Sequence, residues 1–442
     1  MKETKFKQTE IGMIPDDWEV KRLGELFSIK HGFGFKSEFF SDENNQKVVV
    51  TPGNFKLDGG FQYQNKPIYY TGVYPEEFEL ASDDLVITMT DLSKNSDTLG
   101  NPMLIPKDGF VYLHNQRIGL VKILWSNCNK SFLFRLLCSK DYHHKVVSTA
   151  AGSTVKHTSP KRIYDVAVPL PPTIAEQQKI AKALSDVDNV ISTLEKLIAK
   201  KKNLKQGTMQ QLLTGKKRLP GFGPAVVEPV ETTKFKQTEI GEIPEDWEVK
   251  ELHELCDLLN GDRGINYPKD SDMVSNGIPF INAGHLQNGV IDLDNMDYIS
   301  DSHYQKLSGA KIRTNDILFC LRGSLGKNAI SNFDNGAPAS SLCVIRAKKI
   351  NHFYLFQLIN SVIFEKQIED VNTGSSQPNL SAKDVSNFLI PIPMDCVEQT
   401  AIANVLSSMD KEIEALNTKL EKYRNLKTGM MQQLLTGKIR LV

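Results

Sequence analysis

The chain has 442 residues, of which 40% are hydrophobic and 24% are charged, with 53 basic and 53 acidic side chains. This composition is typical of a globular protein with room for two or three domains. No window approaches eighteen consecutive apolar residues, so we expect no membrane partner and a cytoplasmic protein. The six cysteines include no CxxC pair, which argues against a disulfide framework and against a structural zinc site.

The charge is distributed unevenly although its sum is zero. Lys and Arg minus Asp and Glu give about +3 for residues 20–173, about +6 for 176–219 and about −4 for 249–396. Phosphate neutralisation dominates the affinity of proteins for nucleic acids. If this chain binds a nucleic acid, we therefore expect a partner to supply much of the positive charge.

Two segments of the sequence occur twice. Residues 4–20 (TKFKQTEIGMIPDDWEV) recur at 233–249 with 15 of 17 positions identical, and MQQLLTGK at 209–216 recurs unchanged at 431–438. The regions between these ends diverge strongly, whereas drift after a simple duplication would have altered the ends as well. The pattern predicts a pseudo-two-fold internal repeat, in which a common scaffold carries two different recognition regions.

Each half ends in a long predicted helix. After the prolines of 169–172, residues 176–213 contain no Pro and no Gly before Gly207, and apolar residues recur every three or four positions. The second half repeats this spacing, which continues through Leu204 in the first helix and Leu426 in the second. Such a stripe is typical of a two-helix coiled coil. The predicted seam comprises Leu184, Val187, Ile191, Leu194 and Ile198 with Leu406, Met409, Ile413, Leu416 and Leu420.

Chain order favours antiparallel pairing of these two helices. The first helix leaves the first variable region and ends at the linker 220–232, and the second helix leaves the second variable region and ends at Val442. Antiparallel pairing returns the second helix to the first variable region, near the first copy of the repeated frame. Parallel pairing would instead require the linker to run back along the helices.

The variable regions are predicted to be mixed α/β. The expected strands are 47–51, 84–90, 111–113 and 118–123 in the first half and 278–282, 316–321 and 342–346 in the second, and the expected helices are 131–140 and 353–363. The predicted domains are 1–173 with the repeat frame 4–26, the helix 174–219, the linker and second region 220–396 with the frame 233–255, and the helix 397–442.

No catalytic or metal-binding set emerges from the sequence. Residues 323–328 (GSLGKN) resemble a phosphate-binding loop, but Leu321 replaces its first Gly and Asn328 replaces the Ser or Thr that holds magnesium. The two glycines of 31–35 (HGFGF) indicate a structural turn. His143 and His144 have no second ligand cluster near them, so we expect no metal site.

Polar loops are the candidates for DNA contact, because Arg, Lys, Asn, Gln and Ser are side chains that bind phosphates and base edges. Surface loops are commonly polar for other reasons, so the prediction concerns the loops more than any single residue. The candidate residues are Lys36, Ser93, Lys94, Asn95, Ser153, Thr154, Lys156, His157, Arg263, Arg322, Ser324, Lys327, Ser375, Ser376, Gln377 and Asn379. The lysines at 200–202 and 205 fit a solvated helix face better.

The repeated residues carry a resemblance to a known family. The frame FKQTEIGxIPxDWEV, the strand at 315–318 (NDIL), the aligned segments 152–159 and 374–381, and the Glu-Gln-Gln helix ending in MQQLLTGK resemble specificity subunits of type I restriction–modification enzymes. The match covers nearly the whole chain in order. One departure is that 176–178 (EQQ) becomes 398–400 (EQT).

The resemblance implies an α+β fold: two mixed α/β target-recognition domains separated by a long antiparallel two-helix coiled coil, with a pseudo-two-fold internal repeat. It implies double-stranded DNA as a partner, two methyltransferase subunits that bring S-adenosylmethionine, and restriction/translocase subunits that bring ATP and Mg²⁺. No cofactor is expected in this chain, and the residues that bind bases are not identified by the resemblance.

Two other functions remain open from the sequence. Zero net charge suits a duplicated protein–protein adaptor without DNA recognition, whose two domains would bind peptides or proteins. A single-chain nuclease or methyltransferase is a third interpretation, although no catalytic motif supports it.

Overall fold

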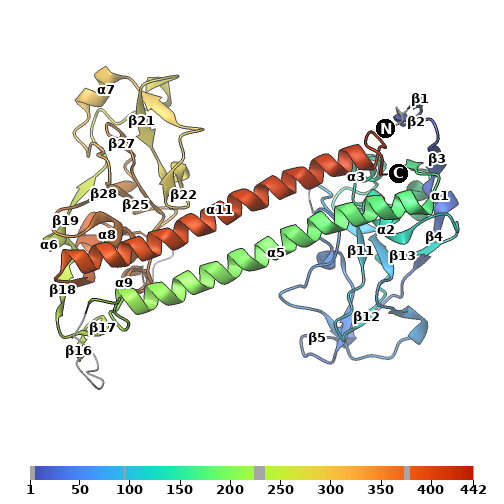
Figure 1. The fold of residues 1–442 in the computed structure, drawn as a ribbon, viewed down its shortest axis with the longest axis horizontal. Coiled ribbons are helices and arrows are strands. Elements are labelled where there is room, and N and C mark those ends of the chain that lie inside the picture. Colours follow the sequence, from blue (N-terminus) through green and yellow to red (C-terminus); the bar gives the residue numbers. More distant parts are fainter. Residues whose placement is uncertain (1–4, 94, 223–233, 373–378, 442) are drawn as a thin grey trace. The chain divides into compact units, whose positions relative to one another are not determined.

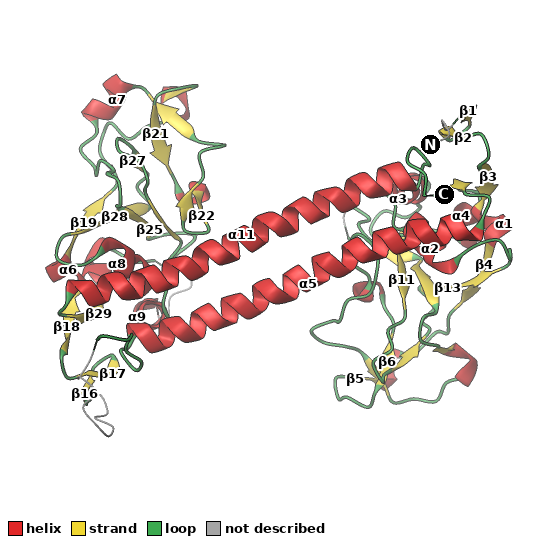
Figure 2. Cartoon of the chain, viewed as in Figure 1, coloured by secondary structure: helices red, strands yellow, loops and turns green. Residues whose placement is uncertain are grey.

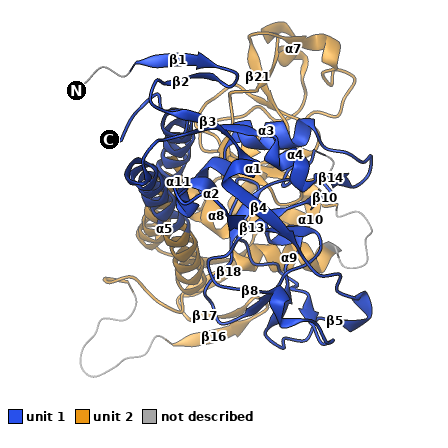
Figure 3. Cartoon of the chain, turned by 90° about the vertical axis from the view of Figure 1, so that its right-hand side faces the viewer, with its two compact units in different colours: residues 1–195, 419–442 blue, residues 196–418 orange. Residues whose placement is uncertain are grey.

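The computed structural model describes residues 5–93, 95–222, 234–372 and 379–441. The chain divides into two compact units, unit 1 with residues 1–195 and 419–442 and unit 2 with residues 196–418 (Figure 3). Each long helix contributes one part to each unit. Both units combine sheets with helices (Figure 2), so the predicted mixed α/β character is confirmed.

Unit 1 contains a four-stranded antiparallel sheet with the order β11-β9-β13-β4. Its strands are β4 (Phe27–His31), β9 (Leu85–Thr88), β11 (Pro102–Leu104) and β13 (Ile118–Ile123). Helix α2 (Lys130–Leu137) begins after Asn129, whose side chain accepts the Phe132 N–H at 3.0 Å as an N-cap. Phe132 and Leu133 of this helix are fully buried in the same core as Ile87 of the sheet.

A second sheet of unit 1 has the order β5-β7-β6-β12-β8, with β12 parallel to β6. Its strands are β5 (Phe40–Ser41), β6 (Lys47–Val49), β7 (Tyr69–Tyr70), β8 (Glu79–Leu80) and β12 (Val111–Leu113). The remaining elements of the unit are β1 (Phe6–Thr9), β2 (Gly12–Pro15), β3 (Glu19–Arg22), α1 (Leu23–Leu26), β10 (Thr90–Asp91), α3 (Lys140–Ser148), β14 (Lys156–His157), α4 (Pro160–Tyr164) and β15 (Ala167–Leu170), with 3-10 turns at Ser37–Phe39, Pro52–Asn54 and Glu76–Phe78.

Unit 2 repeats the four-stranded sheet in the order β19-β28-β25-β26, which corresponds strand by strand to β4-β13-β9-β11. A second sheet has the order β20-β24-β21-β27. The strands are β19 (Cys256–Asn260), β20 (Met273–Val274), β21 (Ile278–Ile281), β24 (Asp297–Ile299), β25 (Ile317–Cys320), β26 (Asn328–Ile330), β27 (Ala337–Pro338) and β28 (Leu342–Ala347). The shared topology confirms the predicted internal repeat although the two sequences have diverged.

The other elements of unit 2 include its copy of the repeated frame and its shorter helices. They are β16 (Phe235–Thr238), β17 (Gly241–Pro244), β18 (Trp247–Glu251), α6 (Leu252–Leu255), β22 (Leu286–Gln287), β23 (Val290–Ile291), α7 (Asp301–Lys306), α8 (His352–Ile359), α9 (Val362–Asn372), α10 (Ala382–Ser386) and β29 (Leu389–Pro393), with 3-10 turns at Asp270–Asp272 and Ala283–His285. In both units the repeated frame forms a hairpin, and its next strand pairs with the strand before the long helix, as β3 with β15 and β18 with β29.

The long helices are α5 (Ile174–Leu213) and α11 (Cys396–Leu434), and within each unit they run side by side (Figure 1). In unit 2, Lys201 Nζ lies 2.7 Å from Glu412 Oε1, and Lys205 Nζ lies 2.6 Å from Asp410 Oδ1. The partner number falls as the residue number rises, so the helices are antiparallel. Unit 1 agrees, because Arg424 pairs with Glu195 and Lys427 pairs with Asp188.

Most of the predicted helix seam is buried. Buried members are Leu184, Val187, Leu194, Ile198, Leu406, Ile413 and Leu420, and half-buried members are Ile191, Met409 and Leu416. The sequence also predicted that the apolar stripe continues through the equivalent residues Leu204 and Leu426. This prediction was wrong, since Leu204 is 54% exposed and Leu426 is 49% exposed. Next to these two leucines, Lys205 and Lys427 form ion pairs between the two helices. Leucines at helical spacing are therefore not always buried.

The repeated ends of the sequence meet in space within each unit. In unit 1, Arg440 after α11 pairs with Asp17 of the frame and with Glu176 at the start of α5, and its guanidinium lies 5.6 Å from the Trp18 ring. In unit 2, Arg218 pairs with Asp246 and Glu398 and lies 5.7 Å from the Trp247 ring. The near-identity of the ends therefore has a physical cause: each MQQLLTGK end packs against a copy of the frame.

The middle glutamine is the same in EQQ (176–178) and EQT (398–400), and it makes the buried hydrogen bonds of this segment. The Gln177 side chain accepts the Asn129 N–H at 2.8 Å and donates to Pro171 O at 3.1 Å, and Gln399 makes the same two bonds to Asn351 N and Pro393 O. Both glutamine side chains are buried. The varying third residue, Thr400, is exposed and accepts a 3.2 Å hydrogen bond from the Asn351 side chain, and its exposure explains why this position tolerates change.

The sequence-predicted elements correspond closely to the observed ones. The predicted strands at 111–113 and 118–123 coincide with β12 and β13, and the other predicted strands are one to three residues too long or too short. The predicted helix 131–140 runs past the end of α2 at Leu137 and includes only the first residue of α3, because Ser139 caps a new helix there. The predicted helix 353–363 also spans a break, since α8 ends at Ile359 and α9 starts at Val362.

Candidate nucleic-acid interface

Two of the candidate loops in unit 1 are held together by a short antiparallel pairing. β10 follows β9 and pairs with β14, with Thr90 opposite His157 and Asp91 opposite Lys156. The candidates Lys156 and His157 therefore lie beside the loop that carries Ser93 and Asn95. Lys94 lies outside the described residues.

The segment before β14 is a tight hairpin that exposes its tip. Ala151 and His157 exchange backbone hydrogen bonds of 3.0 and 2.8 Å, and Gly152 has φ +97°. A Cβ at Gly152 would lie 2.1 Å from Val155 O, so only glycine fits this turn. Ser153 and Thr154 are exposed at the tip, where hydroxyl groups can donate to phosphate oxygens.

Asp91 shapes the neighbouring loop from inside. Its carboxylate is buried and accepts the N–H groups of Ser93 at 2.5 Å and Thr98 at 2.6 Å. Burial raises the pKa of Asp91, but these hydrogen bonds outweigh it and hold the pKa below its ordinary value. The Ser93 hydroxyl accepts the Asp97 N–H at 2.8 Å, whereas the Asn95 side chain is exposed. The loop is thus a preformed turn that presents Asn95 to solvent.

Unit 2 carries the same arrangement with different residues. Arg322, two residues after the end of β25, forms an antiparallel bridge with Asn379, and Leu380 N donates to Leu321 O at 3.0 Å. In unit 1 the equivalent bond joins Thr158 N to Met89 O, also at 3.0 Å. The candidates Ser375, Ser376 and Gln377 lie outside the described residues.

The turn after β25 differs in shape from its counterpart. Gly323 and Gly326 both have φ +79°, and Lys327 N donates to Ser324 O at 3.1 Å, which makes a compact turn with Arg322 and Ser324 exposed. The Lys327 ammonium donates to Ala283 O at 2.8 Å and is partly buried. Lys327 is therefore engaged within the protein, while Arg322 is the exposed cation of this turn.

The third candidate loop in each unit follows the edge strand β4 or β19. Lys36 is exposed and lies 3.7 Å from Glu38, and Arg263 is exposed and donates to Ser340 O at 3.2 Å. Gly32 and Gly261 permit the close approach of these loops, because a Cβ there would lie 2.2 Å from Asn115 O and 2.3 Å from Ala339 O. The two loops thus occupy equivalent places in the fold.

Sequence reasoning missed one exposed polar turn, Gln116 and Arg117, between β12 and β13. Arg117 O accepts the Met89 N–H at 2.9 Å, so the turn adjoins β10, and the Gln116 side chain lies near Gly34 on the other side. Both side chains are exposed. A single arginine in a short turn gives no pattern that distinguishes it from ordinary surface polarity.

In the described parts of the chain, no group of three His, Cys, Asp or Glu side chains is placed to hold a metal ion. None of the described helices is both long enough and apolar enough to cross a membrane. The buried cysteines 128, 256 and 343 have pKa values raised by burial, to about 11, 12 and 12.

Comparison with known proteins assigns the family. The model of the type I restriction modification DNA specificity domain matches residues 15–206 and 244–422. The MjaVIII specificity subunit of a type I restriction enzyme from Methanocaldococcus jannaschii is 28% identical over all of this chain and 97% of its own length. The EcoBI specificity subunit from Escherichia coli is 25% identical over 96% of this chain and 87% of its own length.

A solved structure supports the fold. The type I restriction-modification S subunit from M. genitalium matches with a TM-score of 0.61 at 15% identity, covering 98% of both chains. Because the family model matches both halves and covers most of the sequence, the chain belongs to the family of type I restriction–modification DNA specificity proteins.

Proposed function

We propose that the chain recognises a two-part DNA site, with the mixed α/β domain of each unit binding one half-site. The observation that carries this proposal is the repeated loop pair: β10 with β14 in unit 1, and Arg322 with Asn379 in unit 2. The backbone arrangement is the same, but the exposed side chains differ. Two copies of one scaffold with different side chains at the same place suit two different DNA sequences.

We further propose that partner subunits carry the chemistry and much of the positive charge. Methyltransferase subunits, two per chain as the repeat favours, would bring S-adenosylmethionine, and restriction subunits would bring ATP and Mg²⁺. The exposed leucines at equivalent helix positions, Leu204 and Leu426, support a docking surface that occurs twice. As a specificity protein, the chain directs these enzymes to DNA and is not the catalyst.

The adaptor interpretation has less support than DNA recognition. Family membership favours DNA specificity, and the zero net charge that suited an adaptor is also compatible with a protein whose partners neutralise phosphates. A DNA-recognising chain and an adaptor differ in one direct measurement. Exchanging one domain changes the methylated sequence if the chain recognises DNA, and leaves it unchanged if the chain is an adaptor.

The experiment is a domain exchange in the complete methyltransferase assembly. Residues 20–173 are replaced by the equivalent domain of another family member, and the sites of methylation in genomic DNA are mapped before and after. We expect one half of the recognised sequence to change while the other half stays the same. A change in both halves, or methylation without any sequence preference in the wild-type assembly, would contradict the proposal.

A further inference from the structure

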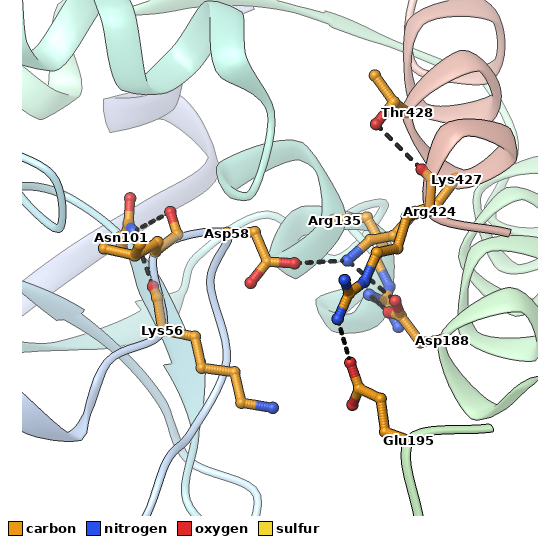
Figure 4. A network of polar contacts seen from close by, with 10 residues as sticks. Lys56, Asp58, Asn101, Arg135, Asp188, Glu195, Arg424, Lys427 and Thr428 are labelled. Carbon is orange, nitrogen blue, oxygen red and sulfur yellow. Dashed lines mark hydrogen bonds and ion pairs between the residues drawn. The ribbon is translucent and has the colours of Figure 1, made fainter. Parts of the chain in front are cut away.

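A lysine of the C-terminal helix joins three segments of unit 1 (Figure 4). Lys427 Nζ lies 2.9 Å from Asp188 Oδ1 of α5 and 2.9 Å from Asp58 Oδ2, which belongs to the loop 56–60 of the recognition domain. The Lys427 side chain is only 17% exposed. Burial lowers the pKa of Lys427, but Asp58 and Asp188 outweigh it, so the pKa is raised and the ammonium stays charged.

The loop that presents Asp58 is a tight turn. Lys56 N donates to Gly60 O at 2.9 Å, and Gly60 N donates to Pro102 O at 2.8 Å, which fixes the turn against β11. Gly59 has φ +83°, and a Cβ there would lie 2.5 Å from Cys138 Sγ. The backbone at Asp58 is therefore fixed, and its side chain, which is 68% exposed, reaches Lys427 from this turn.

The same turn is bonded to a candidate DNA-contacting loop through Asn101. The Asn101 side chain is buried, and its Nδ2 donates to Lys56 O at 3.0 Å and to Leu57 O at 2.9 Å. Nδ2 also lies 3.5 Å from Asp97 O, in the loop that carries Ser93 and Asn95. A continuous polar path thus runs from the helix pair to that loop.

The turn of unit 2 lacks a carboxylate at the position of Asp58. The polar path is therefore not required for the two long helices to pair. The turn equivalent to Asp58-Gly59 is Asn288-Gly289, where Gly289 has φ +79° and packs on Phe356 of α8. The lysine equivalent to Lys427 is Lys205, whose ion pair in the described part of the chain is with Asp410. The carboxylate at the turn is specific to the first recognition domain.

We propose that Lys427, Asp58 and Asn101 are positioning residues that hold Ser93, Asn95 and Asp97 of the first recognition domain in place against the helix pair. The proposal rests on the proposed function, in which the loop that carries Ser93 and Asn95 contacts the first half-site. The positioning residues do not touch bases. They fix where the loop's exposed side chains lie, so that discrimination at one half-site depends on a lysine more than 300 residues away in the sequence.

The test uses Asp58→Asn in the full chain assembled with its methyltransferase subunits. The half-sites are first assigned by the exchange of residues 20–173. Methylation rates are then measured on targets with single-base changes in each half. We expect discrimination at the first half-site to fall about two- to fivefold, the range that a partly exposed ion pair contributes, with the second half-site unchanged.

Three further variants separate positioning from stability. Asp58→Glu keeps the charge and should restore discrimination, and Asp58→Asn with Lys427→Met should lose no more than the larger single effect. Glu195→Gln removes the exposed pair with Arg424 in the same unit, which does not touch the recognition domain, and should leave discrimination intact.

The possible failures are distinguishable. If the domain exchange does not assign half-sites, the proposed function is wrong. If it does, but Asp58→Asn matches the wild type or loses discrimination equally at both half-sites, the positioning role is wrong. A lowered melting temperature in Asp58→Asn with discrimination unchanged would also overturn it.

Discussion

Arg440 forms an ion pair with Glu176, 264 residues earlier in the chain, and Arg218 forms the equivalent pair with Glu398. Each glutamate stands at the start of one long helix, and each arginine follows the end of the other. Both glutamate side chains are at most 3% exposed. These pairs fasten antiparallel helix ends within each unit and account for the sequence identity of the repeated ends.

Replacing Arg440 with Ala is expected to destabilise unit 1 strongly. The change leaves Glu176 charged and buried without its partner, which costs about 3–5 kcal/mol in comparable sites. The matched control is Arg424→Ala, whose pair with Glu195 is about half exposed and contributes about 1 kcal/mol or less. Guanidinium unfolding followed by tryptophan fluorescence measures both, since Trp18 stacks with Arg440. Equal effects of the two variants would contradict the assigned role.

The glycine of each TGK signature should not tolerate alanine. Gly437 has φ +71°, and a Cβ there would lie 2.5 Å from Pro15 Cγ, as one at Gly215 would lie 2.4 Å from Pro244 Cγ. The left-handed backbone alone costs an L-residue about 1–2 kcal/mol, and the clash adds to it. A Cβ at Gly207, inside α5, would meet no atom within 4 Å other than its chain neighbours and the nearby backbone of its own helix. Gly207→Ala should therefore stabilise the chain by about 1 kcal/mol. Thermal unfolding midpoints that shift in opposite directions would support the docking of helix end on frame.

The helix seam can be tested with two leucines of the same helix. Leu184 is fully buried, and truncation to Ala should cost about 2–5 kcal/mol through lost burial and the cavity left behind. Leu204 fits the same apolar spacing but is 54% exposed, so Leu204→Ala should change the unfolding free energy by less than about 0.5 kcal/mol. Chemical denaturation of the isolated full chain measures both. A large loss with Leu204→Ala would mean that the stripe is buried throughout.

The duplication and the helices were predictable because local sequence determines them. Near-identical ends indicate a repeat, and a long run without Pro with apolar residues every three or four positions indicates helix. Chain order then predicted the antiparallel direction, which the two ion pairs Lys201–Glu412 and Lys205–Asp410 together confirm. The exposed Leu204 was not predictable, because spacing gives the face of a helix and not what packs against it.

The candidate site was predictable as loops and not as residues. Polar composition identified Ser153 to His157 and Arg322 to Lys327, and the structure pairs the first segment with β10 and Arg322 with Asn379. The engagement of Lys327 with Ala283 O and the turn at Arg117 depend on contacts between distant segments. No local pattern encodes such contacts, so the sequence could not separate engaged side chains from exposed ones.

The stability of unit 1 should fall as the pH is lowered from about 6.5, because of His114. Its ring is fully buried, Nε2 lies 2.8 Å from Ile118 O, and Nδ1 has no hydrogen-bond partner in the described structure. Burial lowers the pKa of His114 from 6.5 to about 4, although the bond to Ile118 O opposes the shift. The unfolded chain thus takes up a proton near pH 6.5 and the folded chain only near pH 4. The contribution of the neutral His114 to the free energy of unfolding is therefore fully present above pH 6.5 and is lost progressively as the pH falls from 6.5 to 4.

Between pH 6.5 and 5, His114 alone is expected to lower the free energy of unfolding by about 1.5 kcal/mol. His114→Gln keeps a donor for Ile118 O but removes the titrating group, so its unfolding free energy should be lower at pH 7 and nearly constant over the same interval. Guanidinium unfolding at pH 7, 6.5, 6, 5.5 and 5, followed by fluorescence, compares the two proteins. The window stops at pH 5 because carboxylates such as Asp91, whose pKa is lowered, contribute their own losses in more acidic solution. If wild type and His114→Gln lose stability in parallel, another group causes the pH dependence, and the buried imidazole is not neutral for the reason given.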